Sequence, residues 1–278
     1  MGISGGLDSC YLAYLGATKW GLRIKAIHID DGFDTEICKK NIKRLCEKCN
    51  IDIYNIKPDS KQYYQLCKAY MKAGVPNLAV PQDNVLFSAI YEYALSEGIA
   101  DFLSGSNFAL ESILQSGNTV DVYDLTNLKD INKRFGSEGV DKLPLLSVWK
   151  KNYIAYAKKV VTWAPLNYID YNREKALKEL NQFCGFEYYG SKHLENYYTG
   201  FLQLYWLPTK FSVDKRTSHL SSMIISKQLT REEALLEFEK MPYTKEWIDD
   251  AISIIKKKLE LCDSEFDDIV NAPSHQHN

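Results

Sequence analysis

Residues 4–9 read SGGLDS, and this short stretch decides how the first part of the chain folds. Two adjacent glycines let the backbone turn tightly and approach a ligand without side chains in the way. If a helix begins at Ser9, its free N–H groups and the positive end of its dipole point back into that turn. Such a turn is a cradle for phosphate or pyrophosphate. The alternative is an ordinary strand-to-helix turn, whereas a Walker A loop is excluded because no GK[ST] follows.

Strand and helix patterns alternate after this turn. Strands separated by helices of this length predict an α/β fold, in which a parallel sheet carries helices on both faces. The expected strands are residues 23–30, 51–57 and 100–107, the last running into a small-residue loop, and the expected helices are residues 35–49, 59–73 and 84–98.

Ligands of such sheets bind along the edge where right-handed crossovers gather the loops after the strands. We therefore expect Asp30, Gly105 and Asn107 to join residues 4–9 around a bound nucleotide. Only residues 1–3 precede the loop, whereas a buried strand usually has about five residues. We expect the first strand to begin before residue 1.

The second half of the chain has mainly helical patterns, at residues 143–159, 192–207 and 246–261. Thr230 and Glu233 have the spacing of a capping box that opens a further helix. Glycines and polar residues gather at 136–143. The chain is therefore predicted to divide into residues 1–140, the nucleotide-binding domain, and residues 141–278, a mainly helical part that binds substrate and phosphate.

Composition is that of a globular protein with a core, at 45% hydrophobic and 25% charged residues. The formal net charge of −2 gives no general basic field for nucleic acid. No apolar run is long enough for a membrane span, and no signal peptide precedes the motif. We expect a cytoplasmic protein that binds neither nucleic acid nor membrane, with the oligomeric state left open.

Seven cysteines, an odd number, favour reduced thiols over a disulfide framework. Cys46 and Cys49 have CxxC spacing in a charged helical stretch, but a zinc site needs about four ligands and no second pair is present. Incidental helix cysteines are the favoured interpretation, and a redox or sulfur-carrying pair is the alternative.

The SGGLDS stretch resembles the PP-loop of the ATP pyrophosphatase superfamily, whose fold is like that of the adenine nucleotide alpha hydrolases. Those enzymes cleave ATP to AMP and pyrophosphate while they adenylate a substrate oxygen. The resemblance implies that Ser4, Gly5, Gly6 and Ser9 hold the leaving pyrophosphate and that Asp8 helps to hold Mg²⁺ there. A bridging cation also removes the repulsion between an acid and a polyphosphate.

Residues 210–240 carry Lys210, Lys215, Arg216 and His219 ahead of the helix that begins at TREEA. One interpretation is a solvated basic loop. The stretch also resembles the C-terminal signature of the N-acetyl sugar amidotransferases of bacterial surface-glycan synthesis, including lipopolysaccharide (LPS). The turn GSKHLEN at 190–196, ahead of an aromatic helix, is similar to that family as well.

This second resemblance implies ATP-dependent conversion of an acetamido group on a nucleotide-linked sugar into an acetamidino group, with ammonia supplied by a separate glutaminase subunit. We expect Lys210, Lys215 and Arg216 to bind phosphate, with Lys210 and Arg216 joining Asp8 in catalysis. Three further residues are expected to contact the sugar substrate: Glu111, Thr217 and His219. Many members also carry a mid-chain cysteine pair, which residues 73–84 lack.

Two other classes of function remain open. A tRNA-modifying enzyme of the thiolation or lysidine type would need a basic RNA-binding face, which a pI near 6.2 does not supply. A non-catalytic ATP-binding module would not need Asp8 or a large second half.

Overall fold

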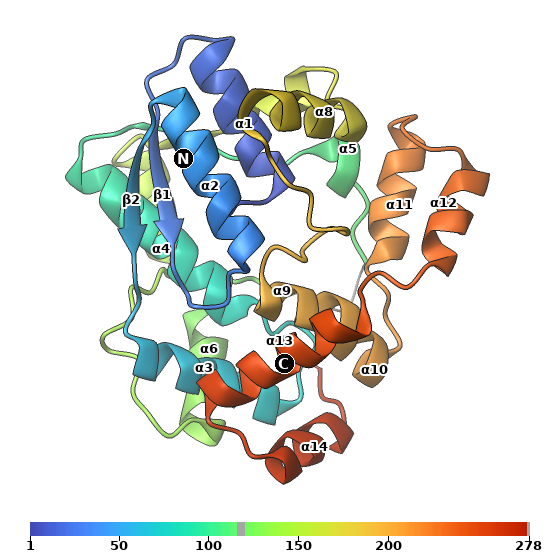
Figure 1. Cartoon of the computed structure of the whole chain (residues 1–278). Coiled ribbons are helices and arrows are strands. Elements are labelled where there is room, and N and C mark those ends of the chain that lie inside the picture. The colour runs from blue at the N-terminus through green and yellow to red at the C-terminus, as the bar shows by residue number, and fades with distance from the viewer. Residues whose placement is uncertain (116–119, 277–278) are drawn as a thin grey trace.

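The computed structural model describes residues 1–115 and 120–276, and it shows a mixed fold of small parallel sheets and many helices (Figure 1). Within these ranges, every helix is too short or too polar to span a bilayer. The strands are β1 (Lys25–Ile29), β2 (Asp52–Ile56), β3 (Asp101–Leu103) and β4 (Val161–Trp163). The helices are α1 (Leu7–Thr18), α2 (Glu36–Cys49), α3 (Ser60–Ala73), α4 (Val80–Ser96), α5 (Phe108–Glu111), α6 (Leu125–Phe135), α7 (Val148–Tyr156), α8 (Arg173–Cys184), α9 (Tyr197–Phe201), α10 (Leu207–Phe211), α11 (Arg216–Ile225), α12 (Arg231–Glu239), α13 (Lys245–Leu259) and α14 (Asp263–Asn271), with a 3₁₀ turn η1 (Pro165–Tyr168) and a π-helical turn η2 (Leu202–Trp206).

The strands pair in parallel, as the sequence predicts, but in two small sheets instead of one continuous sheet. β1 pairs with β2, and β3 pairs with β4. Residues 1–3 lie on the other side of β1, where Ile3 N donates to Ile27 O and Ile27 N donates to Met1 O, both at 2.9 Å. Residues 1–3 therefore form a short extended segment beside β1, with a bridge between Gly2 and Ile27, that leads directly into the SGGLDS loop.

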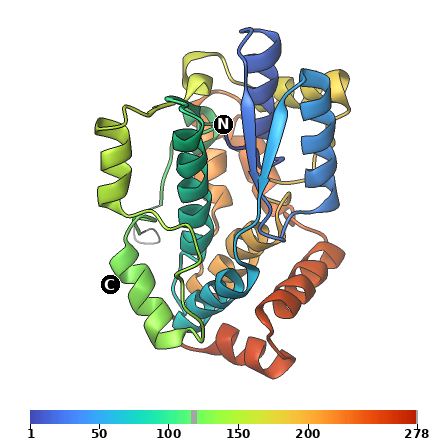
Figure 2. The same cartoon turned by 90° about the vertical axis from the view of Figure 1, so that its left-hand side faces the viewer.

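Helices cover both faces of the β1–β2 pair, as predicted. Figure 2 shows the two strands between α2 and α4. Successive residues of a strand point to opposite faces, so Ala26 packs with the cluster formed by α1, α2 and α8, while Ile27 packs against Ile90 of α4. This arrangement fixes the carboxyl end of β1 and the start of α1 at the same edge.

The largest hydrophobic cluster lies below the sheets, among α3, α4, α6, α9, α10, α13 and α14 (Figure 1). Its largest fully buried side chains include Trp206, Tyr63 and Tyr198. The aromatic stripe of residues 192–207 is thus core, as the helical spacing predicts. Residues from both sides of position 140 contribute to this cluster, so the two parts of the chain share a core, and the domain boundary stays a prediction.

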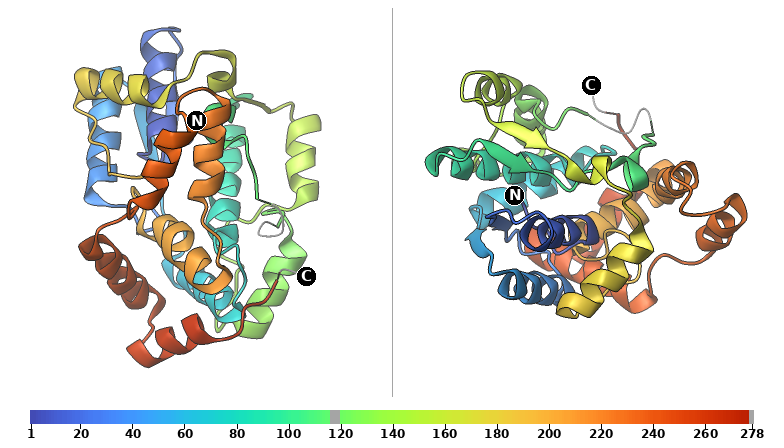
Figure 3. Two further views of the ribbon diagram at one scale, coloured as in Figure 1. Left: turned by 90° about the vertical axis from the view of Figure 1, so that its right-hand side faces the viewer. Right: turned by 90° about the horizontal axis from the view of Figure 1, so that it is seen from above.

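Helix starts follow the capping signals in the sequence. Thr35 opens α2 by accepting from Cys38 N, and Thr230 and Glu233 form the predicted capping box of α12. Figure 3 shows α11 and α12 lying side by side at one edge of the molecule.

Two predicted helices are shorter than expected. Residues 143–147 precede α7 as an irregular segment, because Ser147 caps the helix and Leu146 is bound by Asn84. Residues 192–196 form a turn, because Asn196 caps α9 and His193 has a φ of 71°. The continuation of α9 is π-helical just before Pro208, which has no N–H to donate back to an α-helical turn.

Asn84 should be one of the most costly positions to truncate. Its fully buried amide donates to Val122 O and Leu146 O at 2.7 and 2.8 Å and accepts from Leu146 N at 3.0 Å. Asn84→Ala leaves these groups unpaired and should lower the free energy of unfolding by about 2–4 kcal/mol in urea titrations. The control Asn271→Ala, at an exposed helix end, should change it by less than about 0.5 kcal/mol; equal effects would contradict the assignment.

Candidate functional site

The SGGLDS loop has the tight geometry that the two glycines predict. Gly5 has a φ of +74°, in the left-handed region that favours glycine. A Cβ atom at Gly5 would lie 2.5 Å from Cys38 Sγ and 2.9 Å from Cys38 O. The backbone of this loop is therefore pressed against the start of α2, and a larger residue cannot replace Gly5 without a shift.

Helix α1 begins at Leu7, two residues before the predicted start at Ser9, so Asp8 stands in its first turn. Ser9 Oγ accepts from Ser4 N and donates to Gly6 O, both at 3.2 Å, and Ser4 Oγ accepts from Gly6 N at 3.3 Å. The two hydroxyls thus hold the loop around the positive end of α1, as expected for an anion cradle.

Gly105 completes the cradle from the loop after β3. A Cβ atom at Gly105 would lie 3.2 Å from Ser9 N, so the two backbones are in close contact. Asn107 does not line the cavity: its side chain is buried and accepts from Leu110 N at 2.9 Å, which caps α5. Gly105 therefore lies at the predicted place, while Asn107 shapes the loop that carries it.

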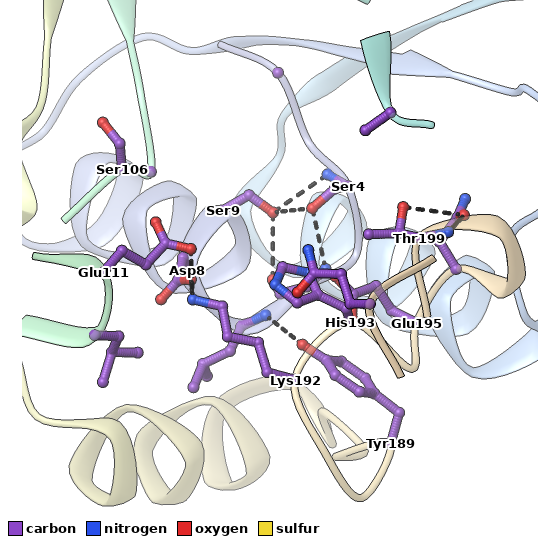
Figure 4. Close-up of a pocket in the computed structure, with 18 of the residues that line it drawn as sticks. Ser4, Asp8, Ser9, Ser106, Glu111, Tyr189, Lys192, His193, Glu195 and Thr199 are labelled. Carbon is purple, nitrogen blue, oxygen red and sulfur yellow. Dashed lines mark hydrogen bonds and ion pairs between the residues drawn. The ribbon is translucent and has the colours of Figure 1, made fainter. Parts of the chain in front are cut away.

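Asp8 faces a lysine that the sequence reasoning missed. Lys192 Nζ lies 3.5 Å from Asp8 Oδ2 and 2.6 Å from Glu111 Oε1 (Figure 4). Tyr171 donates its hydroxyl proton to Asp8. Burial works to lower the pKa of Lys192, but the two carboxylates outweigh it and raise the pKa. A charged ammonium therefore stands between the predicted metal ligand Asp8 and the predicted substrate ligand Glu111.

Glu195 is a second residue that the sequence reasoning missed. A Cβ atom on Gly6 would lie 2.9 Å from Glu195 Oε1, and the other carboxylate oxygen, Oε2, is buried without a hydrogen-bond partner. The backbone oxygen of Glu195 accepts from the N–H and the hydroxyl of Thr35, each at 3.0 Å, which ties this turn to α2. Burial raises the pKa of the Glu195 carboxyl to about 7. The only signal for Glu195 in the sequence was the GSKHLEN turn.

A buried network lies on the other side of the loop. His28 Nδ1 lies 2.9 Å from Ile3 O and His28 Nε2 lies 2.9 Å from Asp34 Oδ2, while Asn196 donates to Asp34 and Gln82 donates to Asp31. Burial works to lower the pKa of His28, but the hydrogen bond and charge of Asp34 outweigh it and raise the pKa. Burial, followed by the charge of Asp34, raises the pKa of Asp31 to about 6.

The predicted nucleotide ligand Asp30 lies outside the cavity. Its carboxylate is 3.0 Å from Lys57 Nζ, and the adjacent Asp31 lines the cavity instead. Neighbouring residues at the end of a strand point to opposite sides, so the choice between two adjacent acids depends on the register of β1.

The predicted phosphate ligands of the C-terminal part are only partly brought to the cavity. Lys210 is a correction: its ammonium donates to Ile269 O and Val270 O at 3.0 and 3.2 Å and so caps the C-terminal end of α14. Lys215 and the exposed Thr217 also lie outside the cavity lining.

Arg216 lines the cavity, but its guanidinium is already engaged. It donates to Asp214 in a bidentate ion pair, with Nη2–Oδ2 at 2.7 Å, and to Phe238 O and Lys240 O at the end of α12. Through the bonds to Phe238 O and Lys240 O, Arg216 joins the start of α11 to the end of α12.

His219, which was predicted to contact substrate, lines the cavity beside Glu111 and His193. One ligand atom from each of these three residues lies within 4.8 Å of the others. Burial lowers the pKa of His219 to about 3, with the positive charges of Lys192 and Lys215 adding to the effect. The same causes hold the pKa of His193 well below its usual range, so both imidazoles are neutral.

These groups surround one cavity of about 820 Å³, the size of a site for a nucleotide-like ligand. It is lined by the SGGLDS loop, the 188–196 turn, the end of β1, the loop after β3 and the start of α11. Figure 4 shows labelled residues of the SGGLDS loop, the turn and the loop after β3 around it. All seven cysteines are free, and burial raises the pKa of Cys46 and of Cys49 to about 11. These thiols are therefore poor nucleophiles.

Replacing Glu195 should change how stability depends on pH. Because the folded-state pKa of about 7 lies above the ordinary value of 4.5, the contribution of Glu195 is fully present below pH 4.5 and is lost as the pH rises through 7. As the pH rises from 4.5 to 8, the wild type should lose about 3 kcal/mol of its free energy of unfolding relative to Glu195→Gln, which does not titrate. Urea titrations at each pH would measure this difference. Glu239→Gln, at an exposed glutamate, is the control, and parallel pH profiles for wild type and Glu195→Gln would contradict the burial argument.

Comparison with known proteins gives one match and one negative result. Residues 195–278 match the family described as LPS biosynthesis protein WbpG-like, C-terminal domain. No curated protein matches the chain. The matched stretch begins at Glu195 and includes His219 and the α11–α12 pair, so part of the cavity wall belongs to it. The C-terminal part of this chain is thus similar to a domain of LPS biosynthesis proteins, in agreement with the predicted link to bacterial glycan synthesis.

Proposed function

We propose that the protein is an ATP-dependent amidotransferase that converts the acetamido group of a nucleotide-linked sugar into an acetamidino group during LPS or related glycan synthesis. One observation carries this proposal. The SGGLDS loop and the WbpG-like C-terminal stretch line the same cavity, so an anion cradle and a glycan-biosynthesis domain share one site.

The anion cradle would hold the pyrophosphate part of ATP. The N-terminal turn of α1 and the glycine backbone offer N–H donors, while Lys192 supplies a positive charge at the same edge. The neutral imidazole of His219 and the other side chains at the start of α11, which line the same cavity, would face the sugar nucleotide. A cavity of about 820 Å³ has room for reacting groups of both substrates.

Magnesium fits the residues that are present. Asp8 offers a carboxylate at the cradle, and Glu195 Oε2 is a buried oxygen that lacks a partner. Mg²⁺ prefers oxygen ligands and is usually held by one or two carboxylates together with phosphate oxygens. When bound, it would neutralise charge on the polyphosphate as pyrophosphate leaves.

The chemistry explains why ATP is needed. An amide carbonyl is a poor electrophile without a good leaving group. Attack of the amide oxygen on the α-phosphorus would release pyrophosphate and form an O-adenylated imidate. Ammonia would then add to the imidate carbon and AMP would leave, so that the amidinium product keeps the protons. The residues around the cavity contribute by positioning the two substrates and by stabilising charge.

The ammonia source is proposed to be a separate glutaminase subunit. The described residues give no support to the sulfur-transfer alternative, because the thiols of Cys46 and Cys49 have raised pKa values. Cys38, which touches the SGGLDS loop, donates its thiol proton to Ser4 O and has a raised pKa as well.

Asp8→Asn tests the proposed role of the cradle. The substitution keeps the shape of the side chain but removes the charge, so AMP and pyrophosphate formation should fall at least tenfold, as expected for the loss of about 1.5–3 kcal/mol. AMP would be measured by chromatography with ATP, Mg²⁺, ammonium and an acetamido nucleotide sugar.

Lys210→Met is the informative comparison, because Lys210 caps α14 outside the cavity. It should keep the rate of AMP formation while lowering thermal stability. If Asp8→Asn were as active as the wild type, the proposed site would be wrong.

A further inference from the structure

Three side chains that carry possible metal ligands lie close together in the cavity, next to Lys192. Glu111 comes from the end of α5, His193 from the turn before α9 and His219 from the first half of α11. One ligand atom of each lies within 4.8 Å of the other two, and the two imidazole centroids are 5.5 Å apart. Three segments distant in sequence thus converge on one point.

We propose that Glu111, His193 and His219 bind one divalent transition-metal ion of the zinc class. Two imidazole nitrogens and one carboxylate oxygen are a donor set that suits Zn²⁺ and its first-row neighbours better than Mg²⁺ or Ca²⁺, which take oxygen ligands. This site lies beside the proposed magnesium position, because Lys192 contacts both Glu111 and Asp8. It uses different protein ligands, and it does not depend on the proposed amidotransferase activity.

The backbone holds one of the ligands in an unusual conformation. His193 has a φ of 71°, and a non-glycine residue in this region is maintained only where the surrounding structure requires it. The hydrogen bonds from Thr35 to the backbone of Glu195, two residues later, anchor the turn. The turn thereby directs His193 toward His219, with which its ring is in contact.

The number of protein ligands indicates an exchangeable site. Structural zinc sites have four protein ligands, whereas sites with three leave a position for water or substrate. All three residues line the 820 Å³ cavity, so the remaining position would face the space where a ligand enters. An oxygen or nitrogen donor of a bound substrate is the chemistry that such a position accepts.

Lys192 sets the affinity of this site. Its ammonium lies 2.6 Å from Glu111 Oε1 and so competes with a cation for this carboxylate, while the charge of Lys215 also acts on His219. Asp8, 3.5 Å from Lys192, and Glu195, 4.0 Å from His193, are the nearby acids that oppose these charges. Removing the ammonium by Lys192→Met should therefore tighten metal binding. Because Lys192 also pairs with Asp8, the histidine variants are needed to distinguish this site from a cation at Asp8.

Cobalt titration of the full chain tests the proposal without an activity assay. Metal-free protein, prepared with a chelator, would be titrated with Co²⁺ while visible absorption is recorded, and bound Co²⁺ would then be displaced by Zn²⁺. We expect one equivalent to bind with ligand-field bands and without the sulfur-to-metal charge-transfer absorption of cysteine ligation. His193→Ala and His219→Ala should each weaken binding at least tenfold, and Lys192→Met should strengthen it severalfold.

His275→Ala is the matched control, because His275 is exposed and lies outside the cavity lining. Far-ultraviolet circular dichroism would establish that each variant is folded. If a histidine variant fails to fold, Glu111→Gln, which changes one partly exposed carboxylate, supplies the same comparison. Absence of stoichiometric binding, charge-transfer absorption from thiolates, or equal affinity in the cluster variants and His275→Ala would each overturn the proposal.

Discussion

The positive N-terminal end of α1 imposes the constraint on which the rest of the site depends. The SGGLDS backbone must pass close to α2, to the loop after β3 and to Glu195, and each approach is made at a glycine. The resulting turn concentrates N–H donors at one point, which favours an anion. The carboxyl of Glu195, beside Gly6, repels such an anion unless it is protonated or shares a cation with it. Its raised pKa favours protonation, and its unpartnered oxygen is free to accept a cation.

The second half of the chain supplies hydrogen-bond partners that hold this turn and the start of α2 in place. Tyr189 accepts from Leu7 N at 3.1 Å, and the backbone oxygen of Glu195 accepts from Thr35 at the start of α2. Asn196 both caps α9 and contacts Asp34, so one residue joins the helical core to the end of β1. The 188–196 turn is therefore a shared wall, and the cavity would be incomplete if either half were removed. This interlocking joins the SGGLDS loop to the stretch that is similar to the WbpG-like C-terminal domain.

Local signals predicted the fold well where they were strong. The glycine pair predicted the loop, and the capping box at Thr230 predicted the start of α12. β-branched residues predicted β1, and alternating residues predicted β2. The sheet was harder to predict, because pairing between β3 and β4 joins segments about sixty residues apart that have no local signal for each other. The π-helical turn before Pro208 likewise depends on packing around Trp206.

Some site residues could likewise be predicted from local sequence, whereas others depend on tertiary contacts. Asp8 and Gly105 follow from the loop and the strand order, whereas the choice of Asp31 over Asp30 depends on strand register. Lys210 looked like a phosphate ligand, but a long side chain can reach either a ligand or a helix end, and here it reaches α14. Lys192 and Glu195 gain their importance only from tertiary neighbours, so their roles could not be predicted from sequence.

The central claim is that the cavity activates an amide through adenylation and then uses ammonia. The most direct measurement is product formation by the purified chain with ATP, Mg²⁺ and an acetamido nucleotide sugar, with ammonium, glutamine or sulfide as the second substrate. The account predicts AMP, pyrophosphate and amidino product in equal amounts with ammonium, and little product with glutamine until a glutaminase is added. Formation of ADP and phosphate, or activity with sulfide and not with ammonium, would contradict it.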